Sequence, residues 1–131
     1  MRPARGSWRV RLTAAAETDF NRILRETAER FGERQATVYA ETLLAALEAL
    51  RDGPRAPGAR PRDELAKGIF TLHAARAGRK ARHLIVFRIE PGRGGKFVQV
   101  LRVLHEAMDL PRRVAPIGAH SRVATGESGD S

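Results

Sequence analysis

Two long apolar runs separated by a glycine-rich turn constrain the fold of this chain most strongly. Leu84 to Ile89 is almost unbroken in apolar residues, and Phe97 to Leu104 is interrupted only by Gln99 and Arg102. Runs of this kind are typical of strands covered on both faces. The residues between them supply the fixed and positive φ values of a reversing loop, namely Pro91, Gly92, Gly94 and Gly95. We therefore predict an antiparallel hairpin at the centre of a sheet, on which the rest of the chain packs.

The length of 131 residues indicates one domain with a single hydrophobic core. Residues 1–7 are polar and basic, and residues 115–131 are rich in Gly, Ser, Ala and Thr without a periodic apolar pattern. Segments of this composition bury too little apolar surface to fold. We expect a flexible extension over residues 1–7, a small α+β domain over residues 8–114 and a disordered tail over residues 115–131.

The chain contains no cysteine, which excludes disulfides, thiolate metal sites and a cysteine nucleophile. No apolar run reaches the length needed to span a membrane, and the arginines near the N-terminus are not followed by the apolar core of a signal peptide. We expect a cytoplasmic protein without membrane contact.

The net charge of +9 is unevenly distributed along the chain. Residues 13–52 carry eight acidic against five basic side chains, whereas residues 53–104 carry twelve basic against three acidic ones. Residues 1–12 add four basic side chains, and residues 105–131 carry three basic against four acidic ones. A cationic sheet half indicates a polyanion or an acidic protein segment as its partner, with a solvated basic surface as the alternative.

The residues before the hairpin predict a strand and two helices. Residues 8–12 alternate between apolar and basic, as in a half-buried strand. Thr13 can cap the first helix, and Gly32 can end it in the left-handed conformation. A second helix follows and is closed by residues 52–54. The apolar stripes of the two helices consist of Phe20, Ile23, Leu24, Ala28 and Phe31, and of Ala36, Ala40, Leu43, Leu44, Leu47 and Leu50.

Two apolar stripes cannot both be hidden by helix–helix packing, so the αα-hairpin should cover one face of the sheet. Residues 55–62 read as a basic loop and residues 69–73 as a further strand. The predicted order is β-α-α-β-β-β in an antiparallel sheet, with a short helical turn near residues 106–110 that Pro111 stops. In the predicted core, Phe20, Ile23, Leu24, Leu43, Leu44 and Leu47 meet Phe70, Leu72, Val86 and the apolar residues of the last strand.

Three familiar motifs are incomplete in this sequence. Residues 92–96 are glycine-rich, but a strand follows them where a phosphate-cradling loop needs a helix, so we interpret them as a hairpin turn. His105 and Glu106 begin like the helix motif of zinc proteases, but Asp109 stands where the second histidine is needed. No serine lies in a strand–turn–helix elbow, so the nucleophile of a hydrolase triad is missing. We expect no metal site and no cofactor.

One group of residues has the chemistry of an active site. Arg82, His83, Arg102 and His105 lie in or beside neighbouring strands and could share one edge of the sheet. Arginines there could hold phosphates, and a histidine could act as acid or base in RNA cleavage. Solvated arginines and a histidine that only caps a strand are the alternative, because the sequence identifies no paired acid and base.

Three stretches carry a resemblance to a known protein family. They are residues 13–20 together with Ile23, residues 83–89, and above all residues 100–112, Val-Leu-Arg-Val-Leu-His-Glu-Ala-Met-Asp-Leu-Pro-Arg. In these stretches the chain resembles the ParE/RelE superfamily of small bacterial toxins from type II toxin–antitoxin systems, over residues 8 to about 114. The last stretch is similar to the ParE branch, whose final strand runs into a histidine and a Met-Asp-Leu-Pro type of tail.

The resemblance implies a helical hairpin on an antiparallel sheet, a cognate ParD-like antitoxin bound in a hetero-oligomer, and DNA gyrase as the target. Members of the RelE branch instead cleave mRNA on the ribosome, with basic residues on the sheet and a tyrosine near the C-terminus. Leu84 stands where many relatives carry an arginine, and the one tyrosine, Tyr39, falls in a helix. These departures favour gyrase inhibition, with a RelE-type mRNA endonuclease and an inactive antitoxin-binding module as alternatives.

The same resemblance predicts two binding surfaces. The segment after the last strand is expected to contact the target through His105, Glu106, Met108, Asp109, Arg112 and Arg113. The cationic sheet and the adjoining helical groove are expected to bind the antitoxin through Arg82, Arg88, Arg102, Leu43 and Leu47. In the nuclease alternative, the candidate catalytic residues are Arg82, His83, Arg102 and His105.

Overall fold

The structure is a computed structural model that describes residues 7–114. The expectations for residues 1–6 and 115–131 lie outside the described residues. The elements in chain order are β1 (Val10–Leu12), α1 (Ala14–Phe31), α2 (Glu33–Ala49), the 3-10 helix η1 (Leu50–Arg55), β2 (Arg60–Pro61), β3 (Phe70–His73), β4 (His83–Glu90) and β5 (Phe97–His105). In this part of the chain, no helix has the length and apolar character needed to cross a membrane.

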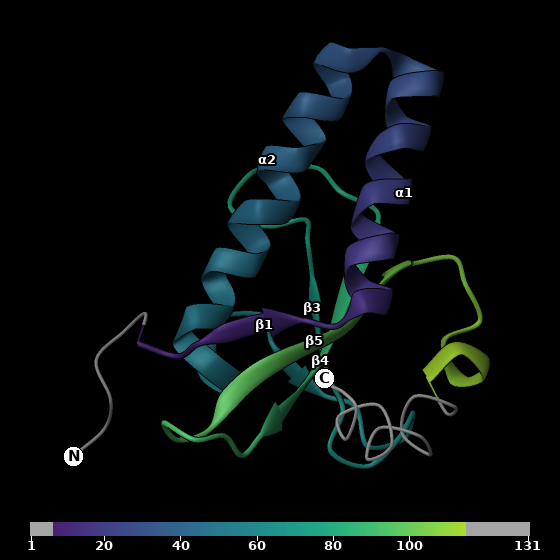
Figure 1. The fold of residues 1–131 in the computed structure, drawn as a ribbon. Coiled ribbons are helices and arrows are strands. Elements are labelled where there is room, and N and C mark those ends of the chain that lie inside the picture. The colour runs from purple at the N-terminus through teal and green to yellow at the C-terminus, as the bar shows by residue number, and fades with distance from the viewer. Residues whose placement is uncertain (1–6, 115–131) are drawn as a thin grey trace.

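The strands form one mixed sheet in the order β1-β5-β4-β3-β2, and the helical hairpin packs on one of its faces (Figure 1). The central β4–β5 hairpin is antiparallel, as are the pairs β3–β4 and β2–β3. β1 pairs in parallel with β5 through Val10 and Val98. The predicted α+β class and element order are therefore confirmed, with the short β2 added and the edge strand β1 running parallel to its neighbour.

The first helix begins and ends at the residues that the sequence indicates. The Thr13 hydroxyl accepts a hydrogen bond from the Ala16 N–H at 3.1 Å, and it donates one to the carbonyl of Leu101 at 3.0 Å. One residue therefore caps α1 and ties it to β5. Gly32 ends the helix with φ of 92°, a conformation that favours glycine.

The main core lies between the helices and the sheet. Its helical side consists of Ala16, Ile23, Leu43, Ala46 and Leu50, and its sheet side of Leu72, Ile85, Phe87, Val98, Val100 and Val103. The prediction for Leu44 is wrong, because its side chain is 53% exposed while Leu43 is 1% exposed. Phe31 is 67% exposed because the tip of the αα-hairpin projects beyond the sheet (Figure 1).

A second, smaller core covers part of the opposite face of the sheet. It consists of Leu65, Ile69, Val86, Leu101, Leu104 and Val114. Val86 was expected to meet the helices, but it belongs to this second core. The residue before Val86 and the residue after it, Ile85 and Phe87, point to the helices instead, as the alternation along a strand requires.

A β-bulge in β5 allows one strand to serve both cores. Val86 pairs with Arg102 and Phe87 pairs with Val100, which leaves Leu101 as the extra residue. The bulge shifts the alternation, so Val100 and Val103 both pack in the main core although they are three residues apart.

A helical turn at residues 110–114 closes the second core. We expected Pro111 to stop a turn near residues 106–110, and this prediction is wrong because the turn begins at Leu110 and contains Pro111. A proline fits the first turn of a helix, where its missing N–H has no helical partner to lose. The turn brings Val114, which is fully buried, onto the sheet.

Candidate functional site

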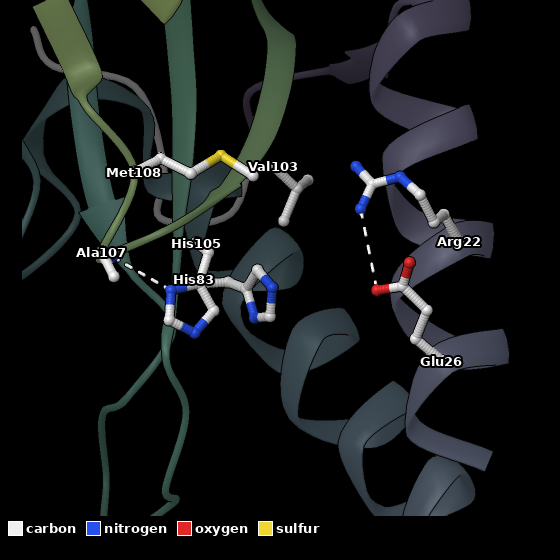
Figure 2. Close-up of a pocket in the computed structure, with 7 residues that line it drawn as sticks. All are labelled: Arg22, Glu26, His83, Val103, His105, Ala107 and Met108. Atoms are coloured by element: carbon white, nitrogen blue, oxygen red, sulfur yellow. Dashed lines mark hydrogen bonds and ion pairs between the residues drawn. The ribbon is translucent and has the colours of Figure 1, made fainter. Parts of the chain in front are cut away.

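A pocket of about 330 Å³ lies between α1 and the C-terminal end of β5. Its lining comes from α1, from β4 and from the end of β5 with the residues that follow, namely Arg22, Glu26, His83, Val103, His105, Ala107 and Met108 (Figure 2). We call it the histidine pocket. The strand register brings its two histidines together, because His83 is the cross-strand partner of His105 and their ring centroids are 5.2 Å apart.

A hydrogen-bond chain holds the ring of His83, and burial keeps it neutral. The Tyr39 hydroxyl accepts a hydrogen bond from the Arg82 N–H at 3.0 Å and lies 2.6 Å from Nδ1 of His83. The hydroxyl oxygen keeps a second lone pair, so this contact forms with either tautomer of the ring: the hydroxyl donates to Nδ1, or Nδ1–H donates to the hydroxyl. Burial lowers the pKa of His83 to about 4, helped by the nearby His105 and Arg22. His83 is thus neutral at physiological pH.

The tautomer of His105 is set by a backbone donor. The Ala107 N–H donates to Nδ1 of His105 at 3.0 Å, so the neutral ring carries its hydrogen on Nε2. His105 therefore offers no free lone pair to the pocket, and the pKa of about 4 makes His83 a weak general base. Glu26 is the carboxylate in the lining, and its Oε1 lies 4.0 Å from Nη1 of Arg22 (Figure 2).

Glu106 is anchored beside the pocket. Its Oε1 accepts a hydrogen bond from Nε2 of His73 at 2.7 Å, and its Oε2 lies 3.4 Å from Nη1 of Arg82. The Ala75 N–H occupies Nδ1 of His73, which places the hydrogen of that ring on Nε2. The hydrogen bond from His73 lowers the pKa of Glu106. The segment expected to contact the target, residues 105–113, therefore leaves β5 in a defined direction.

Arg102 does not line the histidine pocket and instead binds a buried carboxylate. Its Nε and Nη2 donate to Asp19 at 2.7 and 3.0 Å, and the Val103 N–H donates to the same carboxylate at 2.9 Å. Burial alone raises the pKa of Asp19, but these hydrogen bonds together with the charge of Arg102 outweigh burial and lower it. The pairing of β1 with β5 ends at Val100. Beyond that point, the Asp19 carboxylate accepts the Val103 N–H that a neighbouring strand would otherwise bind.

The five residues expected at the antitoxin surface lie in different environments. Arg82 is exposed, with 76% of its side chain accessible, whereas Arg88 forms an ion pair with Glu90 at 2.8 Å. These arginines are six residues apart along an extended segment, roughly 20 Å. Leu47 is partly buried at the edge of the main core, and Leu43 lies inside it.

The segment expected at the target surface is mixed in exposure. Glu106, Asp109, Arg112 and Arg113 are exposed, and His105 is half-buried. Met108 is also half-buried, because it lines the histidine pocket and packs against the second core. The expected target segment and the histidine pocket are therefore neighbours.

The contribution of α1 to this site was not predicted from the sequence. Asp19, Arg22 and Glu26 lie at spacings of three and four residues and so share one face of the helix. That spacing is visible in the sequence, but no local pattern shows that this face of the helix meets the ends of β4 and β5. Among residues 7–114, no three histidine or acidic side chains come together as a metal site would need.

Comparisons with known proteins identify the family. Residues 10–110 match the family of the ParE toxin of the type II toxin–antitoxin system, parDE. A chain of the chromosomal ParDE TA system from P. aeruginosa is similar in fold, with a TM-score of 0.60 and 19% identity over 76% of this chain and 97% of that one. A YoeB/ParE toxin from Agrobacterium tumefaciens gives a TM-score of 0.50 and 17% identity over 74% of this chain and 96% of that one. A search of curated proteins gave no match. Because the family match spans most of the chain, this protein belongs to the ParE toxin family of type II toxin–antitoxin systems.

Proposed function

We propose that this chain is a toxin that is neutralised by a cognate ParD-like antitoxin and inhibits DNA gyrase when the antitoxin is absent. The family match over residues 10–110 is the observation that carries the toxin role. The antitoxin partner follows from the two-component system to which the family belongs.

The chemistry of the histidine pocket supports binding over catalysis. His105 has its Nδ1 occupied by a backbone N–H, the pKa of His83 is lowered to about 4, and Arg102 is bound to Asp19 and does not line the pocket. A ribonuclease would need a group that takes the proton of the attacking hydroxyl and another that protonates the leaving oxygen. Of the proposed catalytic set, His83 and His105 meet in the pocket without supplying that pair.

The exposed segment after β5 supports a protein target. It combines the charges of Glu106, Asp109 and Arg112 with the adaptable apolar side chain of Met108. Residues 105–113 would contact gyrase, with the anchored Glu106 fixing where the segment begins. The antitoxin would cover the neighbouring basic and helical surfaces, at which Arg82, Arg88 and Leu47 are accessible at least in part.

Glu26 is the observation that favours the nuclease alternative. Its carboxylate lines the same pocket as Arg22, His83 and His105, and a carboxylate can act as a general base. In the RelE-type alternative, Glu26 would take the proton and Arg22 would hold the phosphate.

Induction of the chain in growing cells, with and without the product of the adjacent reading frame, tests the proposal. We expect growth arrest with loss of DNA supercoiling or DNA breakage before protein synthesis falls, and rescue by co-expression of the antitoxin. Fragmented mRNA at intact supercoiling would establish the nuclease alternative. Unimpaired growth, with antitoxin binding retained, would establish an inactive binding module.

A further inference from the structure

A cluster of cations at the other end of the sheet has no part in the proposed function. It consists of Arg9 and Arg11, from the β1 segment, and of Arg93 and Lys96, from the β4–β5 connection, and we call it the basic corner. All four residues are exposed. The β4–β5 connection lies at the end of the sheet away from the 110–114 turn (Figure 1). Because β5 is nine residues long, the basic corner and the histidine pocket are separated by roughly 25 Å.

Both arginines of the β1 segment contact the ring of Phe97. The guanidinium carbons of Arg9 and Arg11 lie 5.5 and 5.4 Å from its centroid, within the range of a cation–π contact. Arg9 Nη2 also donates to the carbonyl of Gly95 at 2.8 Å, which joins the β1 segment to the β4–β5 connection. Two like charges are thus held close together on one nearly buried ring.

The acidic residues of the region leave this charge uncompensated. Within residues 7–114, none of the four basic-corner side chains forms an ion pair with a carboxylate. Glu90 is the cross-strand partner of Phe97, but it is paired with Arg88 at 2.8 Å. A concentration of positive charge with no internal partner attracts a polyanion.

The surroundings of the corner favour nucleic acid over an acidic peptide. A peptide that folds on binding uses apolar anchors, and the ring that could receive one, Phe97, is only 8% exposed beneath the two arginines. Phosphate contacts need accessible positive charge, which the exposed side chains of the basic corner provide. A covered ring also cannot serve as the stacking platform that single-stranded nucleic acids use.

We propose that the basic corner binds the phosphate backbone of duplex DNA without base specificity. This contact goes beyond the proposed function, since it requires only the basic corner and is independent of whether gyrase or the ribosome is the target. When the basic corner is bound to DNA, the far end of β5 remains accessible. The histidine pocket and the proposed target segment at that end can then bind a second macromolecule.

Fluorescence anisotropy of a labelled 20-base-pair duplex, titrated with the full chain at several salt concentrations, tests this proposal. The variants Arg93→Gln/Lys96→Gln and Arg9→Gln/Arg11→Gln each remove two charges from the corner. Arg30→Gln/Arg34→Gln removes two exposed charges from the αα-hairpin and is the matched control. Thermal melts establish that each variant is folded.

We expect each corner variant to weaken binding and to reduce the magnitude of the slope of log K against log salt by about 2, since one phosphate contact is lost per side chain. The control variant should bind as the unmodified chain does, and two duplexes of unrelated sequence should bind equally. If the corner variants and the control variant lost equal affinity, binding would depend on the total charge of the chain, and the proposal would be overturned. No duplex binding at low salt, or binding only of single-stranded RNA of the same length, would also overturn it.

Discussion

At the scale of single residues, Asp19 does most to join the helical layer to the sheet. Its carboxylate is 2% exposed and accepts hydrogen bonds from two groups of Arg102, from the Val103 N–H and from Arg22. A buried charge of this kind is tolerated only when it is paired and hydrogen-bonded. Asparagine at this position would remove the charge, keep one acceptor oxygen and place an NH2 group against the donors that the other oxygen now accepts.

Asp19→Asn should lower the free energy of unfolding by about 3–5 kcal/mol at pH 7, measured by urea denaturation. The pKa of Asp19 is lowered from 3.8 in the fold, so its contribution is fully present above that pH and is lost as the pH falls through the folded value. The difference between the two proteins should therefore shrink below pH 3.8. Glu17→Gln, an exposed carboxylate on the same helix, should change the stability by less than about 1 kcal/mol. Equal effects of the two substitutions would contradict this role.

His83 should make stability depend on pH in the same direction as Asp19 but over a higher pH range. Its pKa is lowered from 6.5 to about 4 in the fold, so the unfolded chain binds more protons between these values. We expect the melting temperature to fall as the pH decreases from 6.5 to 4, and His83→Gln to reduce that fall. The NMR titration of the His83 ring should have its midpoint near pH 4. A midpoint above pH 6 would show that the ring is not desolvated as the structure indicates.

At the scale of elements, α2 buries one of two adjacent leucines and exposes the other. Leu43→Ala should lower the free energy of unfolding by about 2–5 kcal/mol, because the substitution opens a cavity in the main core. Leu44→Ala, at a position 53% exposed, should change it by about 0.5 kcal/mol or less. Chemical denaturation of the two variants gives the comparison, and a larger effect at Leu44 would mean that α2 is rotated relative to the structure.

The local signals in the sequence predicted the elements better than their packing. Thr13 and Gly32 mark the ends of α1 through hydrogen bonding and backbone conformation, both of which depend on near neighbours. Val86 was assigned to the wrong face because an apolar run covered on both sides does not reveal which residue faces the helices. The extra residue Leu101 then shifts the alternation in β5, and no local pattern marks such a bulge.

The candidate site was predictable to a smaller extent. The cross-strand register places His83 beside His105, as a meander of neighbouring strands allowed. Arg102 was grouped with them, but its partner Asp19 is 83 residues away in the sequence, and spacing alone cannot show such a pair. The contributions of Arg22 and Glu26 to the pocket likewise depend on how α1 packs against β5.

At the scale of the whole molecule, the two ends of β5 present different surfaces. One end carries the histidine pocket and the proposed target segment, residues 105–113, and the other carries the basic corner. In a binding mechanism, the exposed side chains of the target segment determine affinity, whereas the histidines stabilise its surroundings. In a catalytic mechanism, the side chains of the pocket would determine turnover.

Substitutions in the target segment should therefore weaken gyrase inhibition without abolishing it. Met108→Ala and Arg112→Ala should each cost about 1–2 kcal/mol of binding free energy, measured as the shift in the concentration that inhibits half of the activity. Lys67→Ala, an exposed cation outside this segment, is the matched control for Arg112 and should leave that concentration unchanged.

The most direct measurement is a gyrase supercoiling assay with the purified chain, run in parallel with an mRNA cleavage assay on ribosomes. The proposed function predicts that the chain inhibits supercoiling, that His83→Ala and Glu26→Gln inhibit nearly as well, and that mRNA stays intact. Intact supercoiling together with mRNA cleavage that Glu26→Gln abolishes at unchanged ribosome binding would contradict gyrase inhibition and establish the nuclease alternative.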